Sequence, residues 1–368
     1  MSNQTVTSQT QLIHNKYKYD ENSGGLTVPI NYASTFHQTS VDGFGPYDYG
    51  RSGNPTRHAL EELIAEMEDG VAGFAFSSGM AAISTVLLLF SKGDHLLVTE
   101  DIYGGTHRII TKVLSRFGIV YDFVDMTNEE AIRNAFKENT KAVLLETPSN
   151  PTLKVTDVAV VSKMAKEKGA LVIVDNTFLT PLLSRPLHLG ADIVVHSATK
   201  FLAGHSDVVA GLVVAKDENL AREIGFLQNA FGAVLPPHDA WLVMRGIKTL
   251  HVRLKESCES AAKIAAYLQE HPKVKQVYYP NVGAVLSFEV ADSLAVKGLV
   301  ARLKLPAFAV SLGGVESILS YPRTMSHGAM SESERLARGI TDGLLRLSVG
   351  LESVEDLMED LRQGLEGI

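Results

Sequence analysis

The chain has 368 residues, of which 45% are hydrophobic and 21% are charged, a balance typical of globular proteins. Its formal net charge of -8 argues against nucleic acid or an anionic membrane surface as the main partner. Cys258 is the single cysteine, which excludes an internal disulfide and a cysteine-rich zinc site.

Residues 1–55 are rich in Gly, Asn, Ser and Tyr and lack clear periodicity, so we expect an extended arm. They contain no apolar stretch of the kind found in signal peptides. The longest apolar run, at residues 86–90, is far too short to span a bilayer. We therefore expect a cytoplasmic protein with no membrane partner.

Residues 56–238 show the pattern of a large α/β domain. The segment begins with Leu60, Leu63, Ile64 and Met67, whose spacings of three and four predict a helix. Short apolar runs then alternate with helical stretches: HLLVTE, KAVLLETPSNP, ALVIVDNTF, ADIVVHSATK and AGLVVAKD. This alternation indicates βαβ units and a mostly parallel sheet covered on both faces.

Residues 239–368 follow a different pattern. A long helical stretch runs through ESAAKIAAYLQEHP, and the strand-like runs AVLSFEV and FAVSLGG come after it. The chain ends with the helical pattern VEDLMEDLRQGL. We therefore predict a smaller C-terminal α/β domain over residues 239–368.

Polar residues follow three of the apolar runs in the large domain. They are Asn150, Asp175 and the group Ser197, Thr199 and Lys200. In open α/β sheets, ligands bind outside the carboxyl ends of the strands. Individually, a strand-end Asp is often a helix cap and a Lys is usually a surface residue, but three such endings together indicate a binding site.

The stretch FSSGMAAISTVLLLF adds a possible anion site. Gly79 and Met80 open an apolar helix, and the free N–H groups of a helix start bind phosphate well. Ser78 can equally be a plain N-cap. A phosphate cradle, Asp175 and Lys200 together match pyridoxal phosphate: the lysine forms a Schiff base with its aldehyde, and the carboxylate keeps its ring nitrogen protonated.

Two other chemistries fit the sequence less well. Ser197 to Lys200 match the S-x-x-K element of β-lactamase-type serine hydrolases, but the S-D-N and K-T-G elements are missing. The sequence also lacks H-E-x-x-H, G-x-G-x-x-G and Walker A motifs. We therefore expect no metal site and no dinucleotide or nucleoside triphosphate site.

Several motifs occur in a fixed order: YDYGRSGNPTR, FSSGMAAI, YGGT, ETPSNPT, VDNTF, HSATKFLAGHSD and LLRLSVGLE. From about Thr10 to the C-terminus the chain resembles the Cys/Met-metabolism family of pyridoxal-phosphate enzymes, which includes cystathionine β-lyases, γ-lyases and γ-synthases. The resemblance implies the aspartate-aminotransferase-like α/β fold (fold type I), with a mostly parallel sheet in the large domain. It also implies pyridoxal 5'-phosphate as the cofactor.

The resemblance assigns roles around the cofactor. Lys200 would carry the cofactor and move the Cα proton, Asp175 would pair with the ring nitrogen, and Asn150 would bond the 3-oxygen. Tyr103 would stack on the ring. The implied phosphate ligands are Gly79, Met80, Ser197 and Thr199, joined by Tyr49 and Arg51 of a neighbouring subunit. Shared sites imply a homo-oligomer, usually a tetramer built as a dimer of dimers.

The resemblance also assigns roles around the substrate. Arg346 would clamp the α-carboxylate as a bidentate guanidinium, with help from Ser317. Asp48, Arg108 and Glu316 fall where γ-acting relatives bind the distal end of the substrate. Every position that the chemistry needs is present, which disfavours a non-catalytic scaffold protein.

The choice of reaction is less clear from the sequence. The runs YASTFHQTS, LLVTEDIYGGT and residues 318–350 look most like cystathionine β-lyases of Gram-positive bacteria, so we expect β-elimination of L-cystathionine, a trans-sulfuration step in methionine biosynthesis. Cystathionine γ-lyase and γ-synthase stay open, because Asp48, Arg108 and Glu316 match γ-acting relatives. Some synthases also share the short loop after Tyr279. Methionine-cleaving relatives tend to have Cys where this chain has Gly105, which disfavours a methionine γ-lyase.

Overall fold

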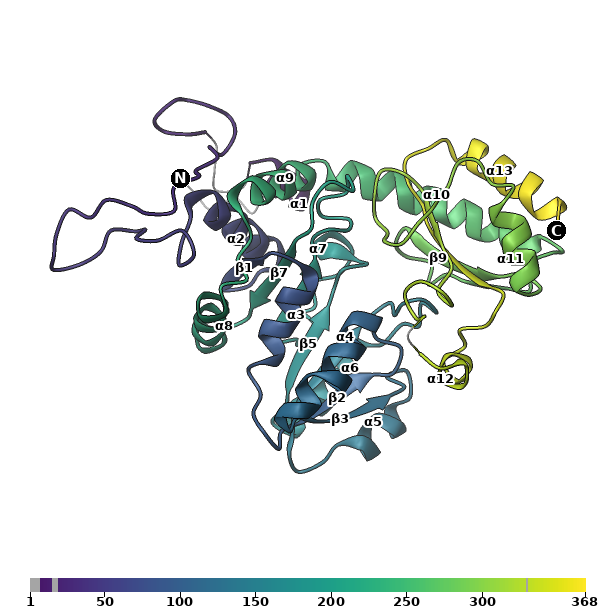
Figure 1. The fold of residues 1–368 in the computed structure, drawn as a ribbon, viewed down its shortest axis with the longest axis horizontal. Helices are drawn as coiled ribbons and strands as arrows, with labels where there is room; N and C mark the ends of the chain where they lie inside the picture. Colours follow the sequence, from purple (N-terminus) through teal and green to yellow (C-terminus); the bar gives the residue numbers. More distant parts are fainter. Residues whose placement is uncertain (1–6, 15–18, 329) are drawn as a thin grey trace.

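The computed structural model describes residues 7–14, 19–328 and 330–368. Figure 1 shows a larger and a smaller α/β body joined by the long helix α10 (Leu250–Glu270), with the N-terminal arm extending from the larger body. The α/β class and the mostly parallel sheet predicted from the sequence are confirmed. No described helix combines the length and the apolarity needed to cross a bilayer. The cytoplasmic location stays a prediction.

A seven-stranded sheet forms the centre of the larger body, in the order β1-β7-β6-β5-β4-β2-β3. Its strands are parallel except β7, which runs antiparallel to β1 and β6. The central strands are buried, which explains their continuous apolar runs. The strands are β1 (Ala72–Phe76), β2 (His95–Thr99), β3 (Val120–Val124), β4 (Thr140–Glu146), β5 (Leu171–Asp175), β6 (Ile193–Ser197) and β7 (Gly211–Ala215).

Helices cover both faces of this sheet and bury two separate apolar cores. One core includes residues of α2 (Pro55–Glu68), α6 (Val158–Glu167) and α9 (Pro237–Ile247). The other includes residues of α3 (Gly79–Leu87), α4 (Gly104–Lys112) and α8 (Glu218–Phe231). The shorter helices are α1 (Ser8–His14), α5 (Glu129–Ala135), α7 (Thr180–Leu183) and a 3-10 turn at Leu114–Phe117.

A five-stranded sheet in the order β10-β11-β12-β9-β8 forms the smaller body. A third apolar core lies in this body, where the sheet packs against α10, α11 (Ser293–Val300) and α13 (Val354–Glu366). The other elements are β8 (Gln276–Tyr278), β9 (Val285–Glu289), β10 (Ala307–Phe308), β11 (Ile318–Ser320), α12 (Glu332–Ala337) and β12 (Leu344–Ser348).

Helix α10 takes part in both bodies. Its first turns place Leu250 and Leu254 in the core of the large sheet, whereas Ile264 and Leu268 belong to the core of the small sheet. Helix α9, which begins just before the boundary predicted at residue 238, also packs in the large core. The chain therefore passes from one core to the other inside a single rigid helix.

The N-terminal arm carries almost no regular structure between residues 19 and 54. Large apolar side chains on it, such as Leu26, Tyr32 and Phe44, are strongly exposed. The arm is tied to the body at Asn54, whose side chain caps α2 by accepting from the N–H groups of Thr56 and Arg57. The arm expected over residues 1–55, with its contribution to a neighbouring subunit, stays a prediction; in this chain α2 already begins at Pro55.

Candidate active site

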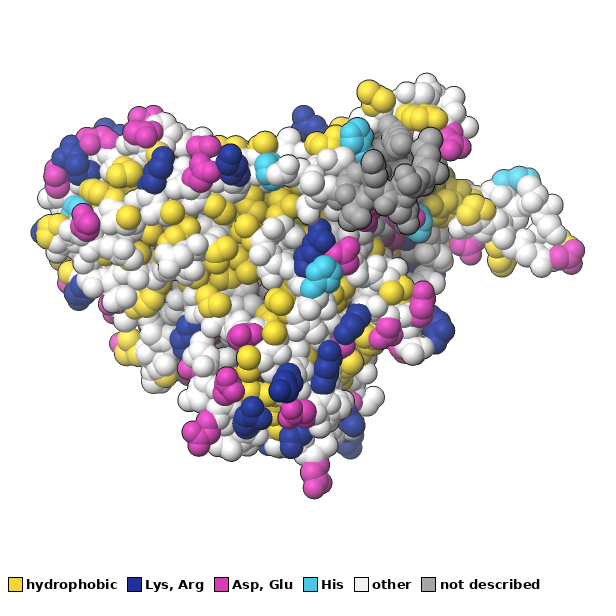
Figure 2. Space-filling view, turned by 180° about the vertical axis from the view of Figure 1, so that it is seen from behind, with side chains coloured by type: hydrophobic (Ala, Val, Ile, Leu, Met, Phe, Trp, Pro, Cys, Tyr) yellow, Lys and Arg dark blue, Asp and Glu magenta, His cyan; other side chains and the backbone are white. Residues whose placement is uncertain are grey.

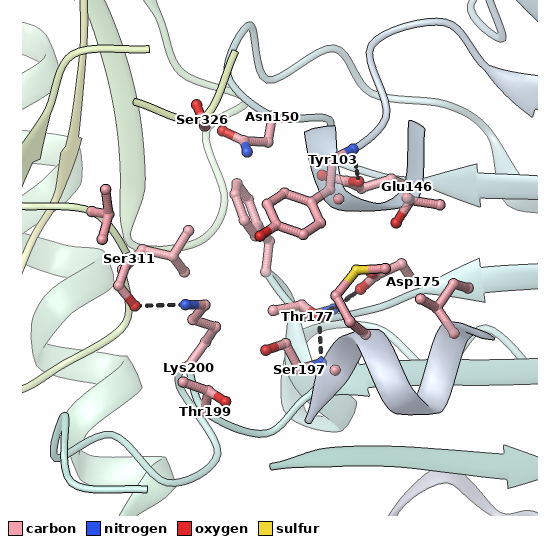
Figure 3. A pocket seen from close by; sticks show the side chains of 18 of the residues that line it. Tyr103, Glu146, Asn150, Asp175, Thr177, Ser197, Thr199, Lys200, Ser311 and Ser326 are labelled. Carbon is pink, nitrogen blue, oxygen red and sulfur yellow. Dashed lines mark hydrogen bonds between the residues drawn. The ribbon is translucent and has the colours of Figure 1, made fainter. Parts of the chain in front are cut away.

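A cavity of about 500 Å³ opens at the carboxyl edge of the large sheet (Figure 3). Strands β4, β5 and β6 are parallel neighbours, so their last residues, Glu146, Asp175 and Ser197, meet at this edge. The volume is within the range that holds a cofactor or drug-sized ligand. Of the predicted site residues, the lining includes Gly79, Met80, Tyr103, Arg108, Asn150, Asp175, Ser197, Thr199, Lys200 and Arg346.

The start of α3 forms one end of the cavity. Ser78 is the N-cap of this helix, and its Oγ accepts from the N–H of Ala81 at 3.0 Å. A Cβ on Gly79 would lie 2.9 Å from the Cβ of Ser197, so only glycine lets the helix start come this close to β6. The cap and the anion site are therefore compatible, and the hydroxyls of Ser197 and Thr199 lie at the same end (Figure 3).

Asp175 is held by the residue that follows its strand. The Oγ1 of Thr177 donates to Asp175 Oδ1 at 2.5 Å, and the N–H of Thr177 donates to the same oxygen at 3.0 Å. Thr177 Oγ1 in turn accepts from the N–H of Ser197 at 2.8 Å. Burial raises the pKa of Asp175, although the bonds from Thr177 lower it. A carboxylate in such surroundings gains strongly from a cationic partner, as a protonated ring nitrogen would be.

Lys200 projects into the cavity from the turn after β6. Its Nζ donates to the Oγ of Ser311 at 2.6 Å (Figure 3). Burial, with a smaller contribution from Arg346, lowers the pKa of Lys200 to about 8. The neutral fraction of this amine near physiological pH is therefore far larger than that of an ordinary lysine, and the neutral form is the one that acts as a nucleophile or a base.

Arg346 on β12 brings the small domain into the site. Its Nη1 donates to Asn150 Oδ1 and its Nη2 to the carbonyl of Ser311, both at 2.7 Å. Its Nε has no partner in the described part of the chain. Burial lowers the pKa of Arg346 to about 10. The bond to Oδ1 leaves the amide nitrogen of Asn150 as the group that can donate to a ligand.

The lining also contains residues that the sequence did not single out, among them Thr177, Ser311 and Glu146. Ser311 contacts both Lys200 and Arg346 and has a φ of 89°, a strained conformation for a residue with a side chain. Glu146 Oε2 accepts from the N–H of Tyr103 at 2.7 Å. Burial, together with the neighbouring Asp175, raises the pKa of Glu146 well above its usual value. Two sequence features could have indicated two of them: a pair of glycines follows Ser311, and Glu146 ends an apolar run.

Several predicted residues lie outside the lining of this cavity. The Oγ of buried Ser317 donates to Glu352 at 2.8 Å and accepts from the N–H of Gly350, which indicates a structural bond. Glu316 accepts from the Oγ of Ser206. Asp48, Tyr49 and Arg51 belong to the arm.

Arg51 instead contacts its own chain at α8. Its Nη1 donates to the backbone oxygen and to the Oδ1 of Asn229, at 2.6 and 2.7 Å. Its guanidinium also lies 5.6 Å from the ring centre of Tyr49. The phosphate-binding roles of Tyr49 and Arg51 in a neighbouring subunit stay predictions.

Pyridoxal phosphate fits the groups that line the cavity. A helix start with two hydroxyls suits its phosphate, Asp175 suits its ring nitrogen, and Lys200 is the amine for its aldehyde. Tyr103 supplies an aromatic ring at the wall of the cavity (Figure 3). No group of three or more His, Cys, Asp or Glu residues in the described ranges could hold a metal ion.

Comparison with known proteins agrees with this fit. The family model described as Cys/Met metabolism PLP-dependent enzyme matches residues 9–366. The chain is 58% identical to cystathionine beta-lyase MetC of Bacillus subtilis, covering 100% of this chain and 98% of the relative. It is 48% identical to cystathionine gamma-lyase of the same organism, covering 99% of this chain and all of that relative.

A solved structure confirms the predicted fold. The cystathionine gamma synthase of Xanthomonas oryzae pv. oryzae, in complex with aminoacrylate and cysteine, superposes with a TM-score of 0.96 at 42% identity over 98% of both chains. The relatives thus include lyases of both kinds and a synthase. The chain belongs to the Cys/Met-metabolism family of pyridoxal-phosphate-dependent enzymes and is a trans-sulfuration enzyme with pyridoxal 5'-phosphate as its cofactor.

Proposed function

We propose that this enzyme cleaves L-cystathionine by β-elimination and releases homocysteine, pyruvate and ammonia. The observation that carries the proposal is the placement of Lys200, whose Nζ lies 2.6 Å from Ser311 Oγ and which is the one lysine among the described residues of the cavity lining. β-Elimination needs a proton taken only from Cα, whereas γ-elimination needs a second one from Cβ. The greater identity to the β-lyase than to the γ-lyase supports the same choice.

The residues divide the work between holding the substrate and moving its proton. Arg346 presents its free Nε and its charge to the α-carboxylate, and Asn150 and Ser311 keep its guanidinium in place. Pyridoxal phosphate, when bound, supplies the electron sink that makes the Cα proton acidic. Lys200 takes that proton as a neutral amine, and Ser311 directs its Nζ. General-base catalysis of this kind contributes about 10²–10⁴-fold.

The distal half of cystathionine carries a second carboxylate. Arg108 lines the cavity and is exposed at its mouth, so its charge can attract this group. Glu316 and Asp48 lie outside the lining. We therefore assign the distal contact to Arg108 within one chain.

We also propose a homo-oligomer, a tetramer built as a dimer of dimers, with shared sites. Tyr49 and Arg51 lie on an arm whose apolar residues Leu26, Tyr32 and Phe44 are exposed in the single chain. An extended arm with exposed aromatic side chains is a suitable element for packing on a second copy. In that arrangement Arg51 would reach the phosphate end of the neighbouring cavity.

The products of purified holoenzyme with L-cystathionine test the proposed reaction. We expect pyruvate, ammonia and homocysteine, with the keto acid identified by chromatography and with Lys200→Ala as the inactive control. Predominant 2-oxobutyrate and cysteine would show a γ-lyase and contradict the proposal. Formation of cystathionine from an O-acylhomoserine and cysteine would show a γ-synthase instead.

A further inference from the structure

Arg253 on α10 is a buried cation that no carboxylate pairs with in the described part of the chain. The residue is only 6% exposed, and burial lowers the pKa of its guanidinium to about 10. In the described part of the chain its hydrogen bonds all go to neutral oxygens. An apolar side chain of similar size would avoid the cost of burying this charge. The oxygens that it binds therefore indicate its role.

Two of these oxygens belong to the turn that carries Lys200. Arg253 Nη1 donates to the carbonyl of Phe201 at 2.9 Å, and Nη2 donates to the carbonyl of Leu202 at 3.3 Å. The N–H of Gly204 closes the turn by donating to the carbonyl of Lys200 at 2.8 Å. Gly204 has a φ of 72°, and a Cβ there would lie 2.1 Å from Arg253 Nη1. The guanidinium thus fills the space beside a turn that only glycine can complete.

The loop that carries Ser311 also packs closely against this turn. A Cβ on Gly313 would lie 2.7 Å from the nitrogen of Phe201 and 3.1 Å from the carbonyl carbon of Lys200. The backbone of Lys200 is therefore in close contact with this loop while Arg253 anchors the residues that follow it. Together the two contacts set the position from which Nζ reaches Ser311 Oγ.

Helix α10 links this anchor to the small domain. Arg253 Nη2 also donates to the carbonyl of Gly246 at 2.9 Å, and its Nε donates to Thr249 Oγ1 at 3.1 Å. One turn further along the helix, Ser257 Oγ donates to the carbonyl of Gly350 at 3.0 Å, just beyond the strand that carries Arg346. The helix therefore contacts both the lysine turn and the end of the arginine strand.

We propose that Arg253 is a positioning residue that fixes the Lys200 turn so that Nζ lies over the substrate Cα. This inference rests on the proposed role of Lys200 as proton carrier. It does not depend on which carbon–sulfur bond breaks. It predicts that loss of the guanidinium slows removal of the Cα proton while binding of the amino acid, which depends on Arg346, changes little.

Exchange of the Cα proton of L-alanine in D₂O measures this step directly, because alanine has no leaving group. For holoenzyme with Arg253→Met we expect the exchange rate at saturation to fall about 10- to 100-fold, since a small misplacement of a reacting group has that effect. The alanine concentration for half-maximal exchange should change less than about threefold, because the carboxylate site is intact. Arg253→Lys should restore part of the rate, because an ammonium can still donate to the carbonyls.

A second readout does not depend on catalysis. In the apoprotein, hydrogen–deuterium exchange by mass spectrometry should show loss of protection in residues 198–204 of Arg253→Met, with protection of β4 and β5 unchanged. Arg335→Met is the matched control, because Arg335 is also only 6% exposed and lies outside the cavity lining. The control should keep wild-type Cα exchange per bound cofactor.

Wild-type Cα exchange in folded Arg253→Met, or unchanged protection of residues 198–204, would overturn the proposal. An equal loss of exchange in Arg335→Met would also overturn it, because the effect would then be general loss of packing. If Arg253→Met does not fold, Arg253→Gln decides the matter: slow exchange supports the role and a wild-type rate refutes it. A product test that shows γ-cleavage would leave these readings unchanged.

Discussion

The amine of Lys200 should titrate near pH 8 in the apoprotein. Its pKa is lowered from 10.5 to about 8, first by burial and then by the charge of Arg346. At pH 7 about 9% of such an amine is neutral, against about 0.03% of an unperturbed lysine amine. The neutral fraction of the buried amine at pH 7 is therefore about 300 times that of an unperturbed lysine.

Arg346→Met separates the two causes of this shift. The substitution removes the neighbouring cation and leaves the burial, so the pKa of Lys200 should rise above 8 and stay below 10.5. Between pH 8 and pH 10.5 the amine of wild-type Lys200 binds fewer protons in the folded chain than in the unfolded chain. The apoprotein should therefore gain stability as the pH rises from 8 to 10.5. Below pH 8 the full penalty of burying the charged amine applies.

Trace acetylation with acetic anhydride over a pH series, followed by peptide mass spectrometry, measures the titration. The exposed Lys297 in the same sample corrects for the reactivity of the reagent. We expect an inflection near pH 8 for Lys200 in wild type and a higher one in Arg346→Met. An inflection near pH 10.5 in wild type, or an identical one in both proteins, would refute the electrostatic reasoning.

Three further predictions concern the walls of the cavity and its sharing. Gly105→Ala places a Cβ 2.4 Å from a ring carbon of Tyr103, so the ring must move. We expect kcat, measured by ammonia release, to fall about tenfold. An unchanged kcat would show that the ring position is unimportant. Glu146→Gln should keep kcat within about threefold, because it retains an acceptor for the N–H of Tyr103. Glu146→Ala loses that acceptor and should lower the free energy of unfolding in urea by about 1–3 kcal/mol. An equal free energy of unfolding in the two variants would contradict this. Inactive Arg51→Ala and Lys200→Ala chains, mixed after reversible dissociation, should recover about a quarter of wild-type activity if sites are shared between two subunits, and verified hybrids without activity would count against sharing.

The sequence predicts the position, at the cavity, of those candidate residues that end the apolar strands. Asp175 and Ser197 follow continuous apolar runs, and parallel neighbours bring such ends together at one edge of the sheet. At these positions the end of an apolar run in the sequence is also the end of a strand at the cavity. The start of α3 was predictable for the same reason, since its serine and glycine are adjacent in the chain and in space.

Contacts made across the two domains were harder to predict. Ser311 contacts Lys200 although it lies 111 positions further along the chain, and only the packing of the small domain on the large one brings them together. Ser317 was expected to assist Arg346, but its hydroxyl bonds Glu352. The run SLGGVES contains two serines, and its local pattern cannot show that only Ser311 lies in the cavity lining, because that depends on the course of the loop before β11.

The shared helix α10 has a consequence for how the protein is made. Ile247, Leu250 and Leu254 complete the core under the large sheet, so a chain growing on a ribosome cannot close that core until these residues have emerged. The later turns of α10 pack against the small sheet, whose strands are translated afterwards. Synthesis should therefore leave the seven strands without a full covering until the start of the small domain has been translated, and that interval is when a chaperone would find an apolar surface to hold.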